Sequence, residues 1–317
     1  MKIFDNIPEN QGDFKNPVIT IGNFDGVHLG HRKIIETAVK NSKLRGGESF
    51  VLTFKNHPRS ILKPGSINEL ITTFEEKQEA ISNLGVDNLI LMNFTKEFSE
   101  LTADEFYNEL LIKKLRVKEI VIGYDHAFGK DRKGNVDYLL HLSSQTGVVI
   151  TRVMEESING EIISSTRVRS EIQKANMEQV SLLLGRNYSI SGRVIKGAGR
   201  GGALLGFPTA NLKIDNPSKI LPPDGVYAVQ VKLPGGELKH AMLNIGKNPT
   251  FNSTEKSIEV HILDFSGDLY GRDITILFFK RIRDEQKFDS PSALIEGIKQ
   301  DEIIVREIFN KNKMKEK

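Results

Sequence analysis

The character of the sequence changes at residues 185–187, where Gly-Arg-Asn separates two different hydrophobic patterns. Before this point, short apolar runs alternate with amphipathic stretches, as expected for βαβ units around a parallel sheet. After it, strand-length segments are separated by turn sequences rich in Pro, Gly and Asp, which is typical of an antiparallel sheet or small barrel. Because a chain of 317 residues can build two cores, we predict two domains, residues 1–186 and residues 187–317.

Apolar runs of strand length recur through the first half, at residues 18–22, 50–54, 88–92, 119–123 and 147–153. The segments between them predict helices, and the clearest one covers residues 29–45 with a single apolar face. Thr102 and Glu105 have the spacing of a capping box, which opens a further helix that is predicted to reach Lys114. Two more helices are predicted to close this half, at residues 165–174 and 177–184. We therefore expect a Rossmann-like α/β domain with a parallel sheet.

Strand patterns recur through the second half, at residues 188–195, 225–233, 240–246, 257–263 and 274–279. A serine N-cap at Ser290 and a proline at the first helical position, Pro291, then predict a final helix that reaches about Asn310. We expect an antiparallel β-barrel followed by this C-terminal helix.

The composition excludes several classes of protein. Lys and Arg total 44 against 41 for Asp and Glu, a formal charge of +3, which is the balance of an ordinary globular protein rather than one that coats a polyanion. There is no cysteine, so any catalyst must use oxygen, nitrogen or a bound metal, and a reducing compartment is favoured. Neither residues 1–11 nor any later stretch has the apolar run of a signal peptide or of a membrane span. We expect a cytoplasmic protein without membrane or nucleic-acid partners.

The segment GNFDGVHLGH runs from Gly22 to His31, directly after the first predicted strand. Its glycines let the backbone approach a ligand closely, and the helix that follows offers free N–H groups to an anion. His28 and His31 lie three residues apart in the first helical turn, so both rings can point toward that anion. The same pair could instead cap the helix, lie on the surface or bind a metal. A strand, a glycine-rich turn and a helix form the ligand-binding edge of an open α/β sheet, which favours a nucleotide.

This segment resembles the nucleotidyltransferase superfamily, whose H-x-G-H signature is shared with class I aminoacyl-tRNA synthetases. Within that superfamily it is similar to the adenylyltransferase module of bacterial bifunctional riboflavin kinase/FAD synthetases. A class I synthetase is disfavoured because the sequence has no lysine-rich second signature and no anticodon-binding region. The resemblance implies that both histidines are catalytic and that ATP is bound by Gly22, Asn23, Phe24, Asp25, His28 and His31.

Two later segments resemble motifs of the same family. LTFKNHP at residues 52–58 is similar to its T-F-x-P-H-P motif, with Asn56 in place of a proline and His57 retained. GYDHAFGKDRKGN at residues 123–135 resembles its G-x-D-x-x-F-G loop. Together these segments imply a flavin held by His57, Asp125 and Phe128.

A third segment, ISSTRVR at residues 163–169, matches the I-S-S-T-x-x-R motif of the family. It implies contacts to the ATP phosphates from Ser165, Thr166 and Arg169. The hydroxyl groups could equally cap the predicted helix, and the two functions can coexist. The implied reaction is attack by a phosphate oxygen of FMN on the α-phosphorus of ATP, which releases pyrophosphate. A phosphomonoester is mostly dianionic at neutral pH, so this reaction needs no general base.

Six glycines between Gly192 and Gly206 predict a loop that bends sharply or folds over a ligand, with a generic flexible loop as the alternative. Pro208 fixes the backbone that follows. Thr209 and Asn211 are two residues apart in an extended segment, so they point to the same side. Their hydroxyl and amide oxygens could form a small hard-cation site.

The glycine-rich stretch resembles the riboflavin kinase domain, whose P-T-A-N motif binds Mg²⁺ and ATP phosphates. The remaining blocks of that domain are matched in order at residues 224–229, 244–251, 257–265 and 282–290. The resemblance implies a metal at Thr209 and Asn211 and ATP contacts from Gly197, Gly199, Thr209 and Asn211. It also implies that Glu259 is the general base for the riboflavin 5'-hydroxyl and that Arg283 contacts the flavin or its new phosphate. Without the motif, a strand glutamate is ordinarily a solvated residue on an outer face.

Together the resemblances imply a bifunctional enzyme with ATP, riboflavin and FMN as substrates and Mg²⁺ as cofactor. It would phosphorylate riboflavin to FMN and then adenylylate FMN to FAD. One alternative is a monofunctional enzyme with an inactive half. Another is a non-catalytic regulator that binds flavin or RNA, although the basic residues Lys130, Arg132 and Lys133 lack the interleaved aromatics of single-strand binders.

Overall fold

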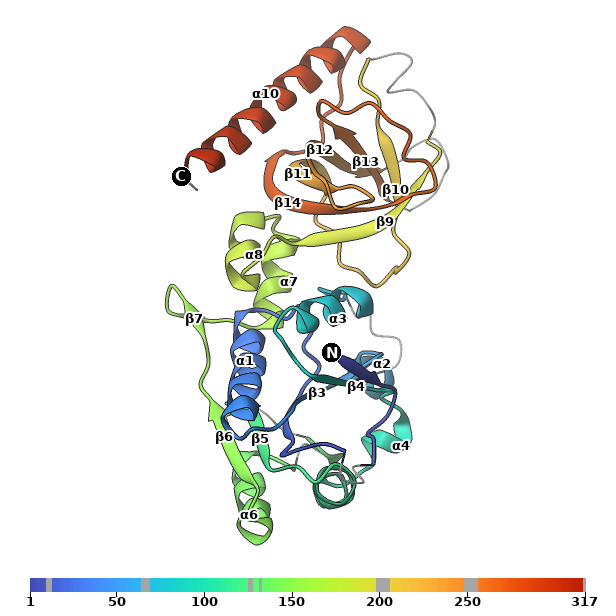
Figure 1. Ribbon diagram of the computed structural model, residues 1–317. Helices are drawn as coiled ribbons and strands as arrows, with labels where there is room; N and C mark the ends of the chain where they lie inside the picture. The colour runs from blue at the N-terminus through green and yellow to red at the C-terminus, as the bar shows by residue number, and fades with distance from the viewer. Residues whose placement is uncertain are drawn as a thin grey trace. The chain divides into compact units, whose positions relative to one another are not determined.

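The computed structural model describes residues 1–9, 13–63, 69–124, 128–130, 133–197, 206–247 and 256–315 (Figure 1). The chain divides into two compact units, Met1–Ser165 and Thr166–Lys317. The second unit therefore includes the helices that precede the predicted domain boundary at residue 186. The functional boundary between residues 186 and 187 stays a prediction.

The first unit contains the predicted parallel sheet. Within the described residues its strands are β1 (Lys2–Phe4), β2 (Val18–Ile21), β3 (Ser49–Phe54), β4 (Asn88–Met92), β5 (Glu119–Gly123) and β6 (Val149–Val153). Their order is β1-β4-β3-β2-β5-β6, and every pairing is parallel. A short hairpin, β7 (Ser157–Ile158) and β8 (Glu161–Ile162), follows the sheet.

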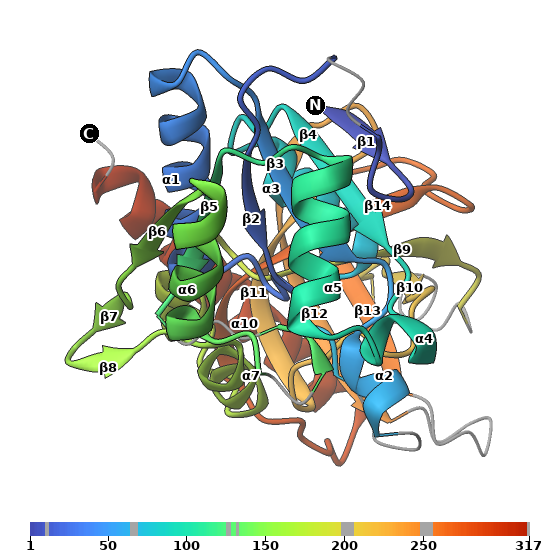
Figure 2. The ribbon, with the colours of Figure 1, turned by 90° about the horizontal axis from the view of Figure 1, so that it is seen from below.

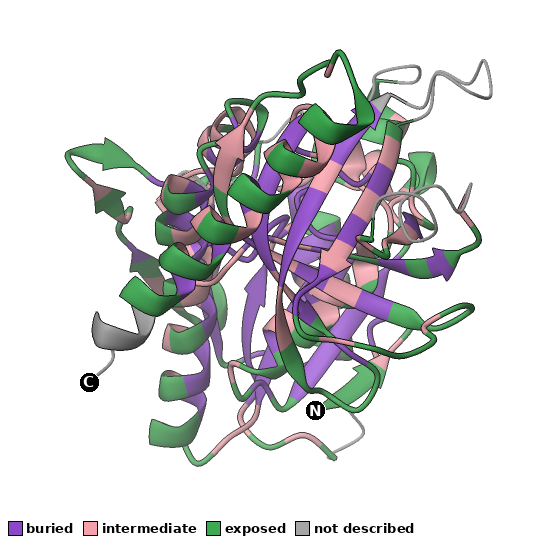
Figure 3. Ribbon diagram, turned by 90° about the horizontal axis from the view of Figure 1, so that it is seen from above, coloured by how far each residue is buried: buried purple, intermediate pink, exposed green. Residues whose placement is uncertain are grey.

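Helices cover both faces of this sheet (Figure 2). They are α1 (Leu29–Leu44), α2 (Pro58–Leu62), α3 (Phe74–Ser82), α4 (Lys96–Ser99), α5 (Ala103–Glu105), the π-helix η1 (Phe106–Lys114) and α6 (Val136–Thr146). On one face, α1 and α3 bury Ile35 and Ile81 against β3 and β4. On the other face, η1 and α6 bury Leu111 and Leu139. Figure 3 shows the consequence: the strands consist largely of buried residues, whereas the helices carry the exposed ones.

The capping box at Thr102 and Glu105 is present, with reciprocal hydrogen bonds of 2.9 and 3.1 Å. The helix that it opens ends at Lys114 as predicted, but from Phe106 onward it is a π-helix rather than an α-helix. Side-chain spacing in a short apolar segment does not distinguish these two forms.

The second unit contains the predicted closed antiparallel barrel. Its strands are β9 (Ser189–Ile195), β10 (Ala210–Lys213), β11 (Gly225–Lys232), β12 (Leu238–Lys247), β13 (Lys256–Ile262) and β14 (Asp273–Arg283), and the barrel order is β10-β13-β12-β11-β14-β9. The helices described beside it are α7 (Ser165–Gln173), which begins at the last residue of the first unit, α8 (Met177–Leu184) and α10 (Pro291–Lys315).

Helix α10 lies along the outside of the barrel, where Val305 and Phe309 pack against Ala228 and Met242 (Figure 1). The hydroxyl of Ser290 accepts a hydrogen bond from the Ala293 N–H at 3.2 Å, which confirms the predicted cap. The helix extends to Lys315, beyond the predicted end near Asn310.

A buried carboxylate at the start of β5 ties α1 to the sheet. Glu119 is 2% exposed and accepts hydrogen bonds from Asn41 at 2.5 Å, Arg45 at 2.5 Å and Thr151 at 2.7 Å. Burial alone would raise the pKa of Glu119, but these three donors outweigh it, so the pKa lies below the ordinary value of 4.5.

We predict that Glu119→Gln lowers the free energy of unfolding by about 1–3 kcal/mol at neutral pH, because one accepting oxygen becomes an amide that cannot accept. The contribution of the ionised carboxylate is present above pH 4.5 and is lost as the pH falls through the lower pKa of the folded state. Urea unfolding at pH 7 and at pH 4 should therefore show the wild-type advantage shrinking in acid. Glu36→Gln, at an exposed pair with Arg32, is the control and should change little. Equal losses in the two variants would contradict the prediction.

Candidate functional site

The first candidate site lies at the carboxyl end of β2, between β3 and β5. The order of the sheet reverses here, and such switch points are where open α/β sheets bind ligands. A pocket of about 150 Å³ opens at this point. It is lined by Ile21, Gly22, Asn23, Phe24, Asp25, His31, Ile34, Gly123 and Ser165. The structure thus brings most of the predicted ATP-binding residues of this segment together.

The turn after β2 has an unusual backbone, because Phe24 and Val27 adopt positive φ angles of 49° and 38° in addition to Gly26 at 85°. The carboxylate of Asp25 holds this conformation by accepting hydrogen bonds from the N–H groups of Ile71 and Thr72 at 3.1 and 3.2 Å. Asp25 lines the pocket, but its side chain is turned to the segment before α3. This arrangement indicates that Asp25 shapes the turn.

The two histidines form one stacked unit. Their ring centroids are 3.6 Å apart, and the Nδ1 atom of His28 accepts the His31 N–H at 3.3 Å as the N-cap of α1. His28 is therefore the helix cap that the sequence left open as an alternative, whereas His31 lines the pocket. Burial lowers the pKa of His31 well below its ordinary value, and the electrostatic effects of His28 and Lys77 lower it further. His31 is thus a neutral imidazole at physiological pH, able to donate a hydrogen bond to an anion.

The motif at residues 163–169 contributes one observed contact to the turn. The hydroxyl of Ser165, the last residue of the first unit, donates to the carbonyl oxygen of Asp25 at 2.9 Å, so it contacts the turn that forms the pocket. Thr166 is the next residue of that helix and is exposed. Arg169 lies one turn further on, within the second unit, and its contact with ATP stays a prediction.

Phe128, one of the residues predicted to hold the flavin, belongs to a row of aromatic rings. Phe54, Phe94, Phe98, Phe106 and Phe128 follow one another with centroid separations of 5.2–5.9 Å. His57 caps α2 by accepting the Arg59 N–H at 3.1 Å. Asp125 lies outside the described residues, so its contact with the flavin stays a prediction.

Asn56, which stands where the family motif has a proline, has a defined structural function. Its side-chain amide donates to the carbonyl oxygen of Phe94 and accepts the Phe94 N–H, both at 2.8 Å. This pair fixes the loop after β3 to the segment after β4.

Lys77, which no motif of the sequence indicated, contacts the turn that lines the first site. It is 7% exposed, and its ammonium donates to the carbonyl oxygens of Asn23 and Phe54 at 3.3 and 2.7 Å and to the hydroxyl of Thr53 at 3.2 Å. Burial lowers the pKa of Lys77 to about 8, although the nearby Asp25 opposes this shift. The sequence does contain one indication of this position. Lys77 lies four residues before Ile81, and this spacing places both side chains on the same, apolar face of α3.

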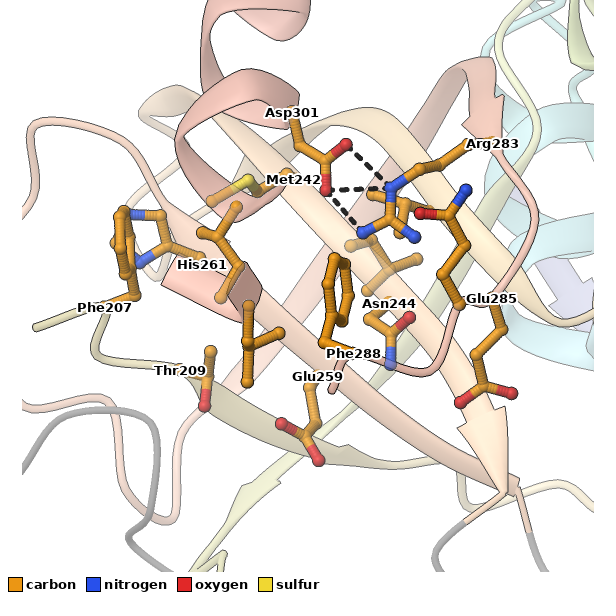
Figure 4. A pocket seen from close by; sticks show the side chains of 15 residues that line it. Phe207, Thr209, Met242, Asn244, Glu259, His261, Arg283, Glu285, Phe288 and Asp301 are labelled. Carbon is orange, nitrogen blue, oxygen red and sulfur yellow. Dashed lines mark hydrogen bonds and ion pairs between the residues drawn. The ribbon is translucent and has the colours of Figure 1, made fainter. Parts of the chain in front are cut away.

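The second candidate site lies between the outer wall of the barrel and α10 (Figure 4). It is a cavity of about 240 Å³ with apolar and polar walls. Its lining residues include Phe207, Thr209, Met242, Asn244, Glu259, His261, Arg283, Glu285, Phe288, Ile298 and Asp301. Three of the residues predicted for this half, Thr209, Glu259 and Arg283, therefore share one cavity.

A cross-strand row places Glu259 between two amides. Glu259 of β13 lies opposite Asn211 of β10 and opposite Asn244 of β12, and directly opposed residues have side chains on the same face of a sheet. Asn211 is also covered by Gly197, where an added Cβ would lie 2.0 Å from its amide nitrogen. Gly199 lies outside the described residues.

Glu259 is half-buried in the wall of the cavity rather than solvated on an open face. Burial raises its pKa above the ordinary value of 4.5. A carboxylate with a raised pKa, facing a cavity, is suited to accept a proton from a bound hydroxyl group. His261, two residues along the same strand, supports the neighbouring segment through a 2.8 Å hydrogen bond between its Nδ1 and the carbonyl oxygen of Pro208.

Arg283 lines the cavity but is engaged by a partner that the sequence did not indicate. Its Nε and Nη2 atoms donate to both carboxylate oxygens of Asp301 on α10, at 2.9, 3.2 and 2.7 Å (Figure 4). Asp301 is 4% exposed. The pair joins β14 to α10 across the cavity wall, and a direct contact between Arg283 and a ligand stays a prediction.

Comparisons with known proteins match two different families to two parts of the chain. Sequence models of the FAD synthetase and riboflavin kinase families match residues 10–167 and 184–309. A protein named bifunctional riboflavin kinase/FMN adenylyltransferase from Buchnera aphidicola subsp. Acyrthosiphon pisum is 38% identical over 315 residues, covering 99% of this chain and 100% of that protein. The protein of the same name from Bacillus subtilis is 38% identical and covers 90% of each chain.

A solved structure is also similar over the full length. It is a crystal structure described as a macrolide-efflux protein from Streptococcus pneumoniae, with a TM-score of 0.85, 34% identity and coverage of 96% of this chain and 99% of that chain. Within the described residues of the present chain, no helix combines the length and the apolar character needed to cross a membrane.

We predict that Asp301→Ala destabilises the second unit by about 3–5 kcal/mol, because it leaves the Arg283 guanidinium in the cavity wall without its carboxylate. A thermal melt followed by calorimetry would report a lower transition temperature. Glu307→Ala, at an exposed position of the same helix, is the control for loss of a carboxylate from α10. The structural assignment of the pair would be wrong if both substitutions lowered the transition temperature equally.

Proposed function

Because the chain belongs to the family of bifunctional riboflavin kinase/FMN adenylyltransferases, we propose that each of its two pockets carries one of the two reactions. The protein phosphorylates riboflavin to FMN with ATP and adenylylates FMN to FAD, which are steps of flavin cofactor biosynthesis. The first pocket is the proposed site of adenylyl transfer, and the cavity beside α10 is the proposed site of the kinase. The allocation rests on Glu259, because only phosphorylation of an alcohol needs a base.

In the first pocket, an oxygen of the FMN phosphate attacks the α-phosphorus of ATP, and pyrophosphate leaves. The attacking phosphate carries no proton that must be removed at neutral pH, so the site has to position the reactants and neutralise charge. Neutral His31 donates a hydrogen bond to the phosphates, and His28 holds it in place by stacking. The N-terminus of α1 adds its free N–H groups. Ser165, Thr166 and Arg169 complete the proposed ATP contacts.

In the second cavity, the 5'-hydroxyl of riboflavin attacks the γ-phosphorus of ATP, and ADP leaves. The hydroxyl must lose its proton, and Glu259 accepts it in the proposed mechanism. Asn211 and Asn244, on either side of Glu259, provide amide groups for orienting the reactants. Phe207, Phe288 and Met242 offer apolar surface for a flavin ring.

The donor chemistry at Thr209 and Asn211 fits Mg²⁺, because hydroxyl and amide oxygens are hard ligands. When bound, Mg²⁺ neutralises phosphate charge during transfer. Within the described parts of the chain, no three His, Asp or Glu side chains gather into a metal site of their own. We therefore propose that the ATP phosphates supply further ligands. A chain without cysteine also supports a cytoplasmic location.

Two reciprocal variants test the allocation. Glu259→Gln should lower the rate of riboflavin phosphorylation by about 10²–10⁴-fold, which is typical of the loss of a general base, and leave adenylylation of supplied FMN intact. His31→Ala should block FAD formation while riboflavin still becomes FMN. The products would be separated by chromatography after incubation with ATP, Mg²⁺ and either riboflavin or FMN. Each variant is the control for the other.

The pH dependence gives the same test a second readout. The wild-type kinase rate should rise with pH through the raised pKa of Glu259, because the ionised carboxylate is the base, and Glu259→Gln should lack this step. Kinase activity that is unchanged in Glu259→Gln would remove the base assignment. A wild-type protein that makes neither product would favour a non-catalytic regulator, and one that stops at FMN would favour the monofunctional alternative.

The second unit should act without the first. We predict that fragments of residues 166–317 and 187–317 both phosphorylate riboflavin, but that the shorter one has the lower transition temperature. The shorter fragment lacks α8, which packs on β14 and buries Met177, Val180, Leu183 and Leu184. Burial of each large apolar side chain is worth about 1.5–3 kcal/mol. A longer fragment that melts cooperatively but has no kinase activity would show that the first unit contributes to the kinase site.

A further inference from the structure

Lys77 is a buried cation of the first unit that the proposed adenylyl transfer does not use. It lies on the inner face of α3, where the other buried side chain of the helix is Ile81. A buried lysine loses hydration, so its presence on an apolar face needs a compensating interaction. The exposed fraction of only 7% shows that this residue is not a surface charge.

The ammonium group of Lys77 joins the ends of two central strands. It donates to the carbonyl oxygen of Asn23 after β2, and to the hydroxyl of Thr53 and the carbonyl oxygen of Phe54 at the end of β3. The Thr53 hydroxyl also donates to the Asn23 carbonyl oxygen at 3.1 Å. The three bonds from Lys77 use all three protons of a charged lysine. The neutral amine has only two, so one contact is lost when Lys77 is deprotonated.

Asn23 connects the hydrogen bonds of Lys77 to the proposed reaction site. It lines the ATP pocket between Gly22 and Phe24, and Phe24 already has a positive φ angle. We propose that Lys77 is a positioning residue for adenylyl transfer, whose charged ammonium holds the turn after β2 in the conformation that receives the ATP phosphates. This inference rests on the proposed assignment of adenylyl transfer to the first unit.

Two titratable groups face Lys77 within the described residues. Asp25, from the turn itself, favours the charged lysine, and His31, from α1, is kept neutral partly by the charge of Lys77. Burial lowers the pKa of Lys77 to about 8, against 10.5 for a free lysine. Burial of the charged form therefore lowers the free energy of unfolding below pH 8. This loss becomes smaller as the pH rises from 8 toward 10.5, because the folded state then contains the neutral amine. Lys77 is retained at a cost to the fold, which is expected of a residue that serves the site.

The test uses the full chain, because its two activities provide an internal control. Lys77→Met keeps the length of the side chain and removes the charge. We expect the kcat of FAD formation from FMN to fall by about 10–100-fold, as for a misplaced reactant, with riboflavin phosphorylation unchanged. The transition temperature should stay within a few degrees of wild type, because removal of the buried charge offsets the lost hydrogen bonds. Lys113→Met, at a side chain that is 66% exposed, should change neither activity.

Two further readouts separate a positioning residue from a merely structural one. Wild-type FAD formation should decline as the pH rises through about 8, and Lys77→Met should show no such decline. Lys77→Arg, which keeps the charge, should restore more FAD formation than Lys77→Met. Normal FAD formation by Lys77→Met, or equal loss of both activities, would overturn the inference. Absence of FAD from the wild-type reaction would instead overturn the proposed adenylyl transfer.

Discussion

The turn after β2 depends on buried hydrogen bonds that hold non-glycine residues in the left-handed region. Phe24 and Val27 both have positive φ angles, and each such residue costs about 1–3 kcal/mol and persists only because its surroundings enforce it. The Asp25 carboxylate accepts two N–H groups from the segment before α3, and the Lys77 ammonium binds the Asn23 carbonyl oxygen. These groups come from separate parts of the chain, so the turn forms only when α3 is docked on the sheet. The proposed nucleotide site is therefore a property of the assembled unit rather than of the motif alone.

The two proposed sites serve reactions with different proton requirements, and they contain different types of residue. A phosphate dianion attacks in one reaction, so a neutral imidazole and backbone N–H groups are sufficient, and a free carboxylate there would repel both substrates. The one carboxylate that lines the first pocket, within the described residues, is Asp25, which is bound to backbone N–H groups. An alcohol attacks in the other reaction, and there Glu259 lies in the cavity wall with a raised pKa. Under the proposed allocation, the positions of Asp25 and Glu259 thus agree with the proton requirement of each reaction.

Elements with local signals could be predicted from the sequence. Most strands of both halves follow from apolar patterning, and the caps at Thr102 and Ser290 mark where helices begin. β1 was missed because it has three residues and gains its order only by pairing with β4 at the edge of the sheet. Two of the residues that the candidate sites add, Lys77 and Asp301, have ordinary sequence surroundings. Their importance comes from partners far away in the chain, which no local pattern contains.

Asn56 shows how a departure from a motif can preserve what the motif does. Proline stiffens a loop by fixing its own φ angle. Asn56 instead uses both ends of its amide to pair with the backbone of Phe94, and the Lys55 N–H donates to the carbonyl oxygen of Met92 just before it. The side chain in effect extends the ladder between β3 and β4 by one more pair. In the family motif, the proline ring restricts the backbone of this loop. In this chain, the hydrogen bonds between Asn56 and Phe94 restrict it instead. Because Phe94 belongs to the aromatic row, this exchange also couples the loop that carries His57 to the proposed flavin site.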